Sequence, residues 1–294
     1  MRLNICVIAF LIISFLMTSC SQENEKTVFE QPDAIDARPF LSEKELLKSV
    51  SAEAWASLDL TDHNNSGAHI SALVVPHHAA AAALTAEAVS RLAESQPPSV
   101  IILAPNHYNE GPAASSTTLD FICYESRLTS DEAAIGRLAA KGMIIRDDRL
   151  FTREHSVGVL LPILSWYLPE TKIITVIFHH DCNEQKILSI IEALKPERDA
   201  GAVIIASIDF SHYLTRDEAI EKDLEMREYL ENGDAETIAR LDASYIDAPA
   251  IMTALLRFFG TEGMEIIANT NSGILMQNSV APCTSYFTIQ FLKK

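Results

Sequence analysis

The amino-acid sequence predicts an α/β fold with three layers, in which a mostly parallel central sheet is flanked by helices. Short runs of almost wholly apolar, β-branched residues recur along the chain, and such runs are typical of strands buried on both faces of a sheet. Stretches with helical periodicity separate these runs, and strands that alternate with helices indicate parallel pairing. The predicted buried strands span residues 70–75, 100–103, 173–178 and 203–208.

Helical segments lie between and around these strands. Ser42 and Glu45 form a capping box, which predicts that the first helix begins there. Two further strands are predicted near the C-terminus, at residues 265–269 and 285–291. Because no repeat or linker interrupts the pattern, we expect a single domain over residues 46–294. The predicted helices span residues 42–58, 79–93, 130–141, 154–168, 183–194, 215–232, 235–242 and 248–259.

Composition and missing motifs narrow the classes of function. The chain of 294 residues is 48% hydrophobic and 21% charged, as globular proteins are. Its net charge of −17 and the lack of a basic run argue against nucleic acid as a partner. Motifs for dinucleotides, P-loops, zincins and nucleophile elbows are missing from the sequence. Cys123, Cys182 and Cys283 form no C-x-x-C pair, so we expect buried free thiols, with one disulfide as the alternative.

The first twenty residues resemble the signal sequence of a bacterial lipoprotein. The apolar core over residues 5–17 has the length of a signal-peptide core and is short for a membrane span. It ends in Leu-Met-Thr-Ser-Cys at residues 16–20, which resembles a lipobox. We therefore predict a signal peptide over residues 1–19, a lipid anchor on Cys20 and a polar tether over residues 20–45. The anchor would hold the protein at the bacterial cell envelope, periplasmic or surface-exposed; a plain signal peptide or an uncleaved anchor is the alternative.

Histidines are concentrated just after the predicted strands. Because parallel strands end at one edge of a sheet, side chains from four strand ends can converge there. Imidazole binds borderline metal ions and transfers protons near neutral pH. Glu154, Asp181 and Asp209 are carboxylates beside these histidines that can orient the rings. One histidine after a strand is more often a hydrogen-bonded loop residue, but six together, with a seventh at a helix start, predict a shared site. The candidates are His77, His78, His107, His155, His179, His180 and His212.

Five segments carry a family resemblance. They read Val-Pro-His at 75–77, Leu-Ala-Pro-Asn-His at 103–107, Glu-His-Ser at 154–156, Ala-Ser-Ile-Asp-Phe-Ser-His-Tyr at 206–213 and Asn-Ser-Gly at 271–273. In this order they resemble the MEMO family, whose bacterial members are named AmmeMemoRadiSam system protein B. The likeness extends over nearly the whole predicted domain. It implies a fold like that of the class III extradiol ring-cleaving dioxygenases.

The resemblance also implies a metal centre. Class III dioxygenases hold non-haem iron with two histidines and one carboxylate, and the MEMO family has a related pocket with two histidines and a cysteine. His77 and His107 match the two histidine ligands. The family cysteine is missing near residues 245–249, where Asp247 is the candidate replacement. The alternative is that Asp247 only caps the helix that follows.

Further roles follow from the same resemblance. His212 matches the pocket histidine that acts as acid and base in the dioxygenases, Asp209 matches its neighbouring acid, and His155 matches the histidine of the family's Glu-His-Ser segment. We therefore expect these three residues to take part in catalysis. Additional candidates for the pocket, at positions where the family leads us to expect other residues, are His78, His179 and His180.

Two functions are consistent with this sequence. The first is a dioxygenase-like redox enzyme that uses non-haem iron or copper on a small-molecule substrate. The alternative is a non-catalytic surface lipoprotein that binds a metal, a ligand or a protein partner through a relict dioxygenase pocket. The missing family cysteine favours the alternative, and a lipid anchor also suits a binding protein held at the surface.

Overall fold

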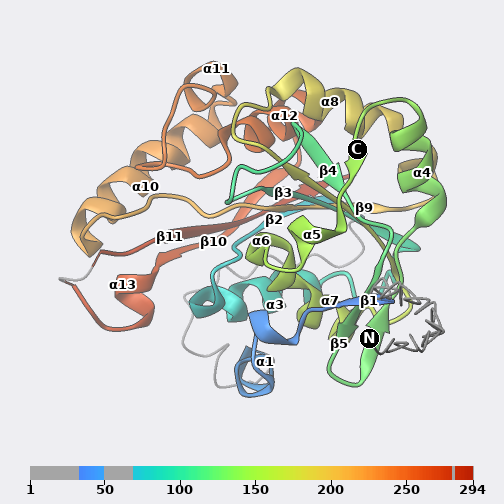
Figure 1. The fold of residues 1–294 in the computed structure, drawn as a ribbon. Helices are drawn as coiled ribbons and strands as arrows, with labels where there is room; N and C mark the ends of the chain where they lie inside the picture. The colour runs from blue at the N-terminus through green and yellow to red at the C-terminus, as the bar shows by residue number, and fades with distance from the viewer. Residues whose placement is uncertain (1–32, 50–68, 280–281, 294) are drawn as a thin grey trace, which may run out of the picture. The chain divides into compact units, whose positions relative to one another are not determined.

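A mixed sheet of eight strands lies at the centre of the computed structural model, which describes residues 33–49, 69–279 and 282–293 (Figure 1). Its strand order is β10-β11-β2-β9-β3-β8-β4-β7. The four central strands are parallel, β11 and β10 extend one edge in antiparallel fashion, and β4 and β7 form the other edge. The strands are β2 (Ile70–Val75), β3 (Ser99–Pro105), β4 (Ala114–Ser116), β7 (Ile145–Arg146), β8 (Lys172–Phe178), β9 (Val203–Ser207), β10 (Met264–Asn271) and β11 (Ser285–Leu292).

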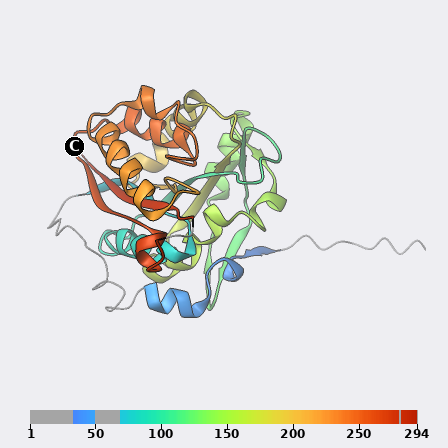
Figure 2. The same cartoon turned by 90° about the vertical axis from the view of Figure 1, so that its left-hand side faces the viewer.

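Helices cover both faces of this sheet and complete three layers. In Figure 2, blue α1 and cyan α3 lie on one side of the sheet, and orange α10 to α12 lie on the other. The first layer contains α1 (Glu43–Ser49), α3 (Ala82–Ser90) and α7 (Leu160–Tyr167). The second layer contains α4 (Glu132–Ala140), α8 (Glu184–Ala193), α10 (Arg216–Glu231), α11 (Ala235–Ile238) and α12 (Pro249–Phe259).

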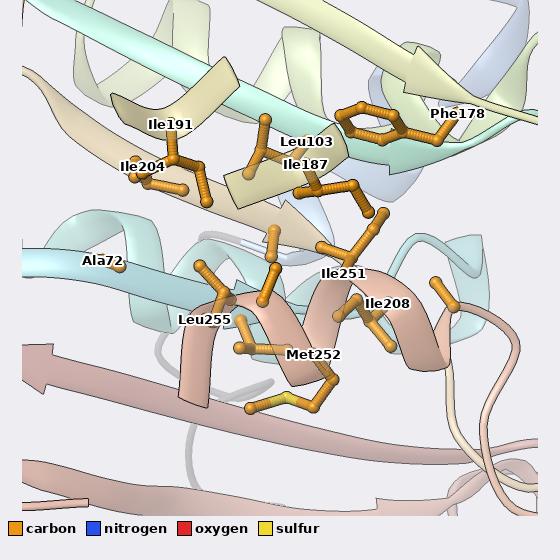
Figure 3. Packing of buried hydrophobic residues seen from close by; sticks show 14 of the residues in the cluster. Ala72, Leu103, Phe178, Ile187, Ile191, Ile204, Ile208, Ile251, Met252 and Leu255 are labelled. Atoms are coloured by element: carbon orange, nitrogen blue, oxygen red, sulfur yellow. The ribbon is translucent and has the colours of Figure 1, made fainter. Parts of the chain in front are cut away.

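The predicted fold class is therefore confirmed, and the packing explains why the strands are apolar throughout. Successive side chains of a strand point to opposite faces of the sheet. Ile101 and Leu103 of β3 accordingly belong to the core under α8 and α12, whereas Val100 and Ile102 belong to the core on the other face. Figure 3 shows Leu103 among the isoleucines of α8 and α12. Each such fully buried aliphatic side chain contributes roughly 1.5–3 kcal/mol to folding.

The predicted helix over 154–168 is broken in two. The structure has α6 (His155–Gly158) and then α7, with Val159 between them. Pro162 explains the break, because proline lacks an N–H and its ring clashes with the carbonyl four residues earlier, here that of Gly158. The helix predicted over 235–242 is likewise shorter and ends at Ile238. Of the helix predicted over 42–58, residues beyond Ser49 lie outside the described part of the chain.

Short elements without a clear sequence pattern were not predicted. They comprise a second sheet of three strands and several single-turn helices. Their side chains alternate too few times to give a periodic signal. These elements are β1 (Ala34–Asp36), β5 (Asp120–Cys123), β6 (Ser126–Leu128), α5 (Asp148–Phe151), α9 (Lys195–Asp199), α13 (Ser272–Leu275) and the 3-10 helix η1 (Arg38–Phe40). The 3-10 helix η2 (Ala79–Ala81) forms the start of the helix that was predicted over 79–93.

Part of the segment that we predicted as the tether packs with the folded domain. The folded unit begins at Asp33, inside the range 20–45 assigned to the tether. β1 pairs with β5 in parallel, and the side chains of Ile35 and Leu41 are buried. Burial of these two apolar side chains holds the segment against the domain. The predicted signal peptide and Cys20 lie outside the described residues.

Two further expectations concern the cysteines and membrane spans. Cys123, Cys182 and Cys283 are free and buried, as predicted. Among the helices of the described residues, none has both the length and the apolar character needed to cross a bilayer.

Candidate metal centre

Loops at the carboxyl edge of the sheet bring three histidine rings together. His77 follows β2, His107 follows β3 and His155 opens α6. The ring centroids lie 4.9 Å apart for His77 and His107, 5.4 Å for His77 and His155, and 4.2 Å for His107 and His155. One nitrogen from each ring lies within 4.8 Å of the others. We call these three histidines, together with Asp247, the histidine pocket.

His77 is held in one orientation by β9. Its Nδ1 lies 3.0 Å from Oγ of Ser207, and that hydroxyl donates its own proton to the carbonyl of Ser156 at 2.6 Å. Ser207 Oγ must therefore accept from His77, so Nδ1 carries the hydrogen. The free Nε2 faces Oδ2 of Asp247 at 3.2 Å. Burial alone would lower the pKa of His77, but Asp209 and Asp247 outweigh it and raise that pKa.

His107 is oriented by a buried carboxylate. Glu154 accepts the His107 backbone N–H at 2.8 Å and pairs with the ring Nδ1 at 2.8 Å. The Nε2 atom of His107 is left facing Oδ2 of Asp247 at 3.8 Å. Burial opposes the charge on both partners, but Asp247 and Glu154 outweigh it and raise the pKa of His107 to about 10. The histidine in turn holds the pKa of Glu154 below its usual value.

Asp247 points its carboxylate at both histidines and does not cap α12. The helix has Ala248 as its N-cap and no side-chain cap. Within the described residues, neither buried oxygen of Asp247 accepts a hydrogen bond of normal geometry. Burial would raise the pKa of Asp247, but the rings of His77 and His107 favour the charged form and hold that pKa well below its usual range. The cap that we considered as the alternative is therefore not formed, and the carboxylate faces the two rings instead.

His155 is the most exposed of the three rings. Its side chain is 44% exposed, whereas that of His77 is 1% exposed. Glu154 caps the start of α6 by accepting the Ser156 N–H, which places His155 in the first turn. Burial, with the charges of His107 and His77, lowers the pKa of His155 to about 4. The ring is therefore neutral near pH 7 and has a lone pair available for a metal ion.

Asp209 is buried beside His77. One oxygen accepts the His77 backbone N–H at 3.1 Å, and the other lies 3.6 Å from Nε2 of the same residue. Burial raises the pKa of Asp209, although His77 opposes this shift. The charges of His212 and His78 oppose this shift as well. His78 is fixed through Nδ1 by the hydroxyl of buried Tyr286 at 2.6 Å.

His212 lies in the loop that follows β9. Its backbone N–H donates to Ala243 at 2.9 Å. Its Nδ1 is buried and lacks a hydrogen-bond partner among the residues that the structure describes. Asp209 contacts His77 of the histidine pocket, whereas His212 is not a member of the group of three rings.

The remaining two pocket candidates form a different group. His179 and His180 follow β8, and their ring centroids lie 4.4 Å apart. Both hydrogen-bond to Asn109, and each lies near a carboxylate oxygen of Asp181. No hydrogen bond, ion pair or ring contact joins them to the histidine pocket within the described residues. Their strand lies beyond β3 in the sheet, which separates them from the ends of β2 and β9.

Sequence reasoning missed two residues that orient the pocket. Ser207 is a polar residue in an otherwise apolar strand, two positions before Asp209, and that contrast was an available signal. Tyr286 had no such signal, since an aromatic residue in a predicted strand is normally part of the core.

Comparisons with known proteins agree on one family. A family model described as Memo-like protein matches residues 42–272. The chain is 27% identical over 218 residues to a MEMO1 family protein of Caldivirga maquilingensis, covering 70% of this chain and 77% of that protein. It is 30% identical over 190 residues to a MEMO1 family protein of Aeropyrum pernix, covering 60% and 67%.

One solved structure supports the fold. The chain resembles a crystal structure of an uncharacterized protein from Escherichia coli K12 with a TM-score of 0.51 and 13% identity, over 76% of this chain and 100% of that one. At this identity the likeness concerns the fold alone. Since the Memo-like match includes most of the chain and every residue of the histidine pocket, the protein belongs to the Memo family.

Proposed function

We propose that the histidine pocket binds a redox-active transition metal ion, iron or copper, and that the protein uses it for oxidative chemistry on a small molecule. The observation that carries this proposal is that Nε2 of His77 and Nε2 of His107 both face Oδ2 of Asp247, at 3.2 and 3.8 Å. Two imidazoles and one carboxylate with open positions are the ligand set of non-haem iron oxygenases.

Of the two donor separations, 3.2 Å lies within the range expected for ligands of one ion and 3.8 Å lies slightly above it. Bonds of about 2.1 Å to a common ion separate neighbouring donors by roughly 3.0 Å at right angles and roughly 3.6 Å at 120°. Both rings keep their Nδ1 atoms occupied by Ser207 and Glu154, as metal-bound histidines do. The buried Asp247 carboxylate, without a hydrogen-bond donor in the described residues, also fits a ligand that awaits a cation.

The surrounding residues have separate tasks in this proposal. The metal ion supplies Lewis acidity and redox chemistry when it is bound. His155, neutral and half-exposed, is available as a further ligand or as a hydrogen-bond partner of the substrate. Asp209, which contacts His77, and His212, in the loop after β9, hold or move a proton. Catechol-type substrates are the class to test first, because the family resembles the extradiol dioxygenases.

Metal content of the purified full chain tests the ligand assignment. We expect the wild-type protein to retain iron or copper, and His77→Ala, His107→Ala and Asp247→Asn each to lose most of it. His69→Ala is the matched control, because His69 is exposed and belongs to neither histidine group. The measurement is the number of metal ions per protein chain, determined by elemental mass spectrometry after gel filtration. Unchanged metal in any of the three pocket variants would remove that residue from the ligand set.

Dioxygen uptake separates the two functions. The iron-loaded protein should consume dioxygen with at least one catechol, and His107→Ala should abolish the uptake. Full metal occupancy without uptake for any catechol would instead favour the non-catalytic binding protein with a relict pocket.

A further inference from the structure

The turn after β8 carries a second group of metal-ligating side chains. His179, His180 and Asp181 each offer one ligand atom, and these atoms lie within 4.8 Å of one another. Nδ1 of His179 is 3.5 Å from one oxygen of Asp181, and Nε2 of His180 is 3.0 Å from the other. These spacings are similar to those of the donors in the histidine pocket. We call these three residues the β8-turn group.

Asn109 holds both histidines in place. Its carbonyl accepts Nε2–H of His179 at 2.9 Å, and its side-chain oxygen accepts the backbone N–H of His180 at 2.9 Å. A ring nitrogen that donates to a backbone carbonyl is the usual arrangement behind a metal-bound histidine, because it fixes the tautomer. Here it leaves the lone pair on Nδ1 of His179, which faces Asp181.

The position of Asn109 is itself well defined. Asn109 adopts a positive φ of 49°, which asparagine tolerates better than most residues. It lies two residues after His107, in the loop that connects β3 with β4. One loop therefore carries a histidine of the pocket and supports the ring of His179 and the backbone of His180.

We propose that the β8-turn group is a second metal site, which binds a borderline divalent cation such as Zn²⁺, Ni²⁺ or Cu²⁺. Two imidazoles and a carboxylate are suited to these ions. The side chains of His180 and Asp181 are 62% and 76% exposed, so an ion reaches them directly from solvent and keeps water in its remaining positions. The proposal is independent of the function proposed for the histidine pocket.

The interactions that a cation would replace are weak. The Asp181 backbone N–H approaches Nδ1 of His179 at 3.2 Å, at the long end of the normal range. The pairing of His180 with Asp181 is at the surface, where such pairs contribute about 0–1 kcal/mol. Binding of a cation therefore costs little in lost interactions. High exposure makes us expect weaker binding here than in the histidine pocket.

Calorimetric titration of the metal-free, untagged full chain with Zn²⁺ tests the proposal. We expect two equivalents for the wild-type protein. His180→Ala and Asp181→Asn should each lose the weaker equivalent, bound at the β8-turn group, and keep the tighter one. The double variant His77→Ala/His107→Ala should lose the tighter equivalent, bound in the histidine pocket, and keep the weaker one. His69→Ala is the control and should keep both. Since His180 and Asp181 are exposed, their substitution leaves the fold intact, which circular dichroism checks.

The stoichiometries separate this proposal from the previous one. If the histidine pocket binds no metal, the wild-type chain takes up one equivalent and His180→Ala takes up none. If His180→Ala and Asp181→Asn both bind as much Zn²⁺ as the wild-type chain, the β8-turn group is not a metal site.

Discussion

Glu154 is the residue on which most of the candidate metal centre depends. Its carboxylate accepts hydrogen bonds from the backbone of His107, from the backbone of Ser156 and from the ring of His107. It is 1% exposed, so water cannot replace a lost partner. An unsatisfied buried donor costs about 1–3 kcal/mol. One side chain thus starts α6 and fixes the orientation of the His107 ring.

Glu154→Gln should weaken metal binding without removing a ligand. The backbone and the ring of His107 use different oxygens of Glu154, and in the variant one of these positions is an NH2 group that cannot accept. Loss of the partner behind a ligating histidine typically costs 10–100-fold in metal affinity, and we expect a loss in about that range. Competition with a chelator of known affinity measures it. Glu132→Gln, at an exposed position in α4, is the control, and equal affinities for the two variants would contradict the assigned role.

At the scale of elements, the short helix α6 joins the N-terminal segment to the site. Gly158 ends α6, and a Cβ atom on it would overlap the ring of Phe40 in η1. The glycine is therefore needed for close packing rather than for an unusual backbone angle. This contact connects residues before α1 with the helix that carries His155.

Gly158→Ala should destabilise the protein by about 1–3 kcal/mol, the usual cost of overpacking. Urea unfolding measures the change. Gly136→Ala is the matched control, because a Cβ at Gly136 meets no atom within 4 Å and the helix α4 should gain about 0.5–1 kcal/mol. In a Phe40→Ala background the cost of Gly158→Ala should nearly disappear. An equal cost in both backgrounds would show that η1 does not pack on α6.

At the scale of the whole molecule, one buried carboxyl group makes the stability of the fold depend on pH. Asp223 of α10 accepts hydrogen bonds from Ser285 of β11 at 2.6 Å and from Asn269 of β10 at 2.9 Å. Burial raises its pKa from 3.8 to about 7, although these two hydrogen bonds oppose the shift. The folded state therefore binds a proton more tightly than the unfolded chain does.

This difference predicts a pH dependence of unfolding. Asp223 stabilises the folded state fully below about pH 4, where its carboxyl group is protonated in both states. Between pH 4 and about 7 the unfolded chain releases this proton while the folded state keeps it, so the stabilisation falls as the pH rises and is lost at about pH 7. About three pKa units correspond to roughly 4 kcal/mol at most. Asp223→Asn should flatten the curve of unfolding free energy between pH 4 and 7. Parallel curves for wild type and variant would refute the shifted pKa.

Cellular location is also a property of the whole molecule. We propose that Cys20 carries the lipid anchor, because residues 16–20 resemble a lipobox. Cys20→Ala should move the protein from the membrane fraction to the soluble fraction and abolish labelling by radioactive palmitate. Cys123→Ala, which changes a buried thiol of the folded domain, should leave both readouts unchanged. Membrane association without labelling would favour an uncleaved anchor.

The sequence by itself determined the central strands and the edge of the sheet where histidines would meet. Continuous apolar runs are strong signals because both faces of each strand are buried. His77 and His107 were therefore predictable as neighbours, since each directly follows such a run. The short strands β4 and β7 were not predictable, because two or three residues carry no period.

Only the tertiary structure decided how these side chains face one another. Asp247 is far from both histidines in the chain and meets them because its backbone N–H donates to the carbonyl of Asp209. Likewise, strand order rather than sequence assigned His179 and His180 to a separate group, since β8 lies on the far side of β3. Local patterns specify elements through burial and periodicity, whereas a metal site depends on ångström-scale contacts between distant residues, and these exist only once the chain has packed.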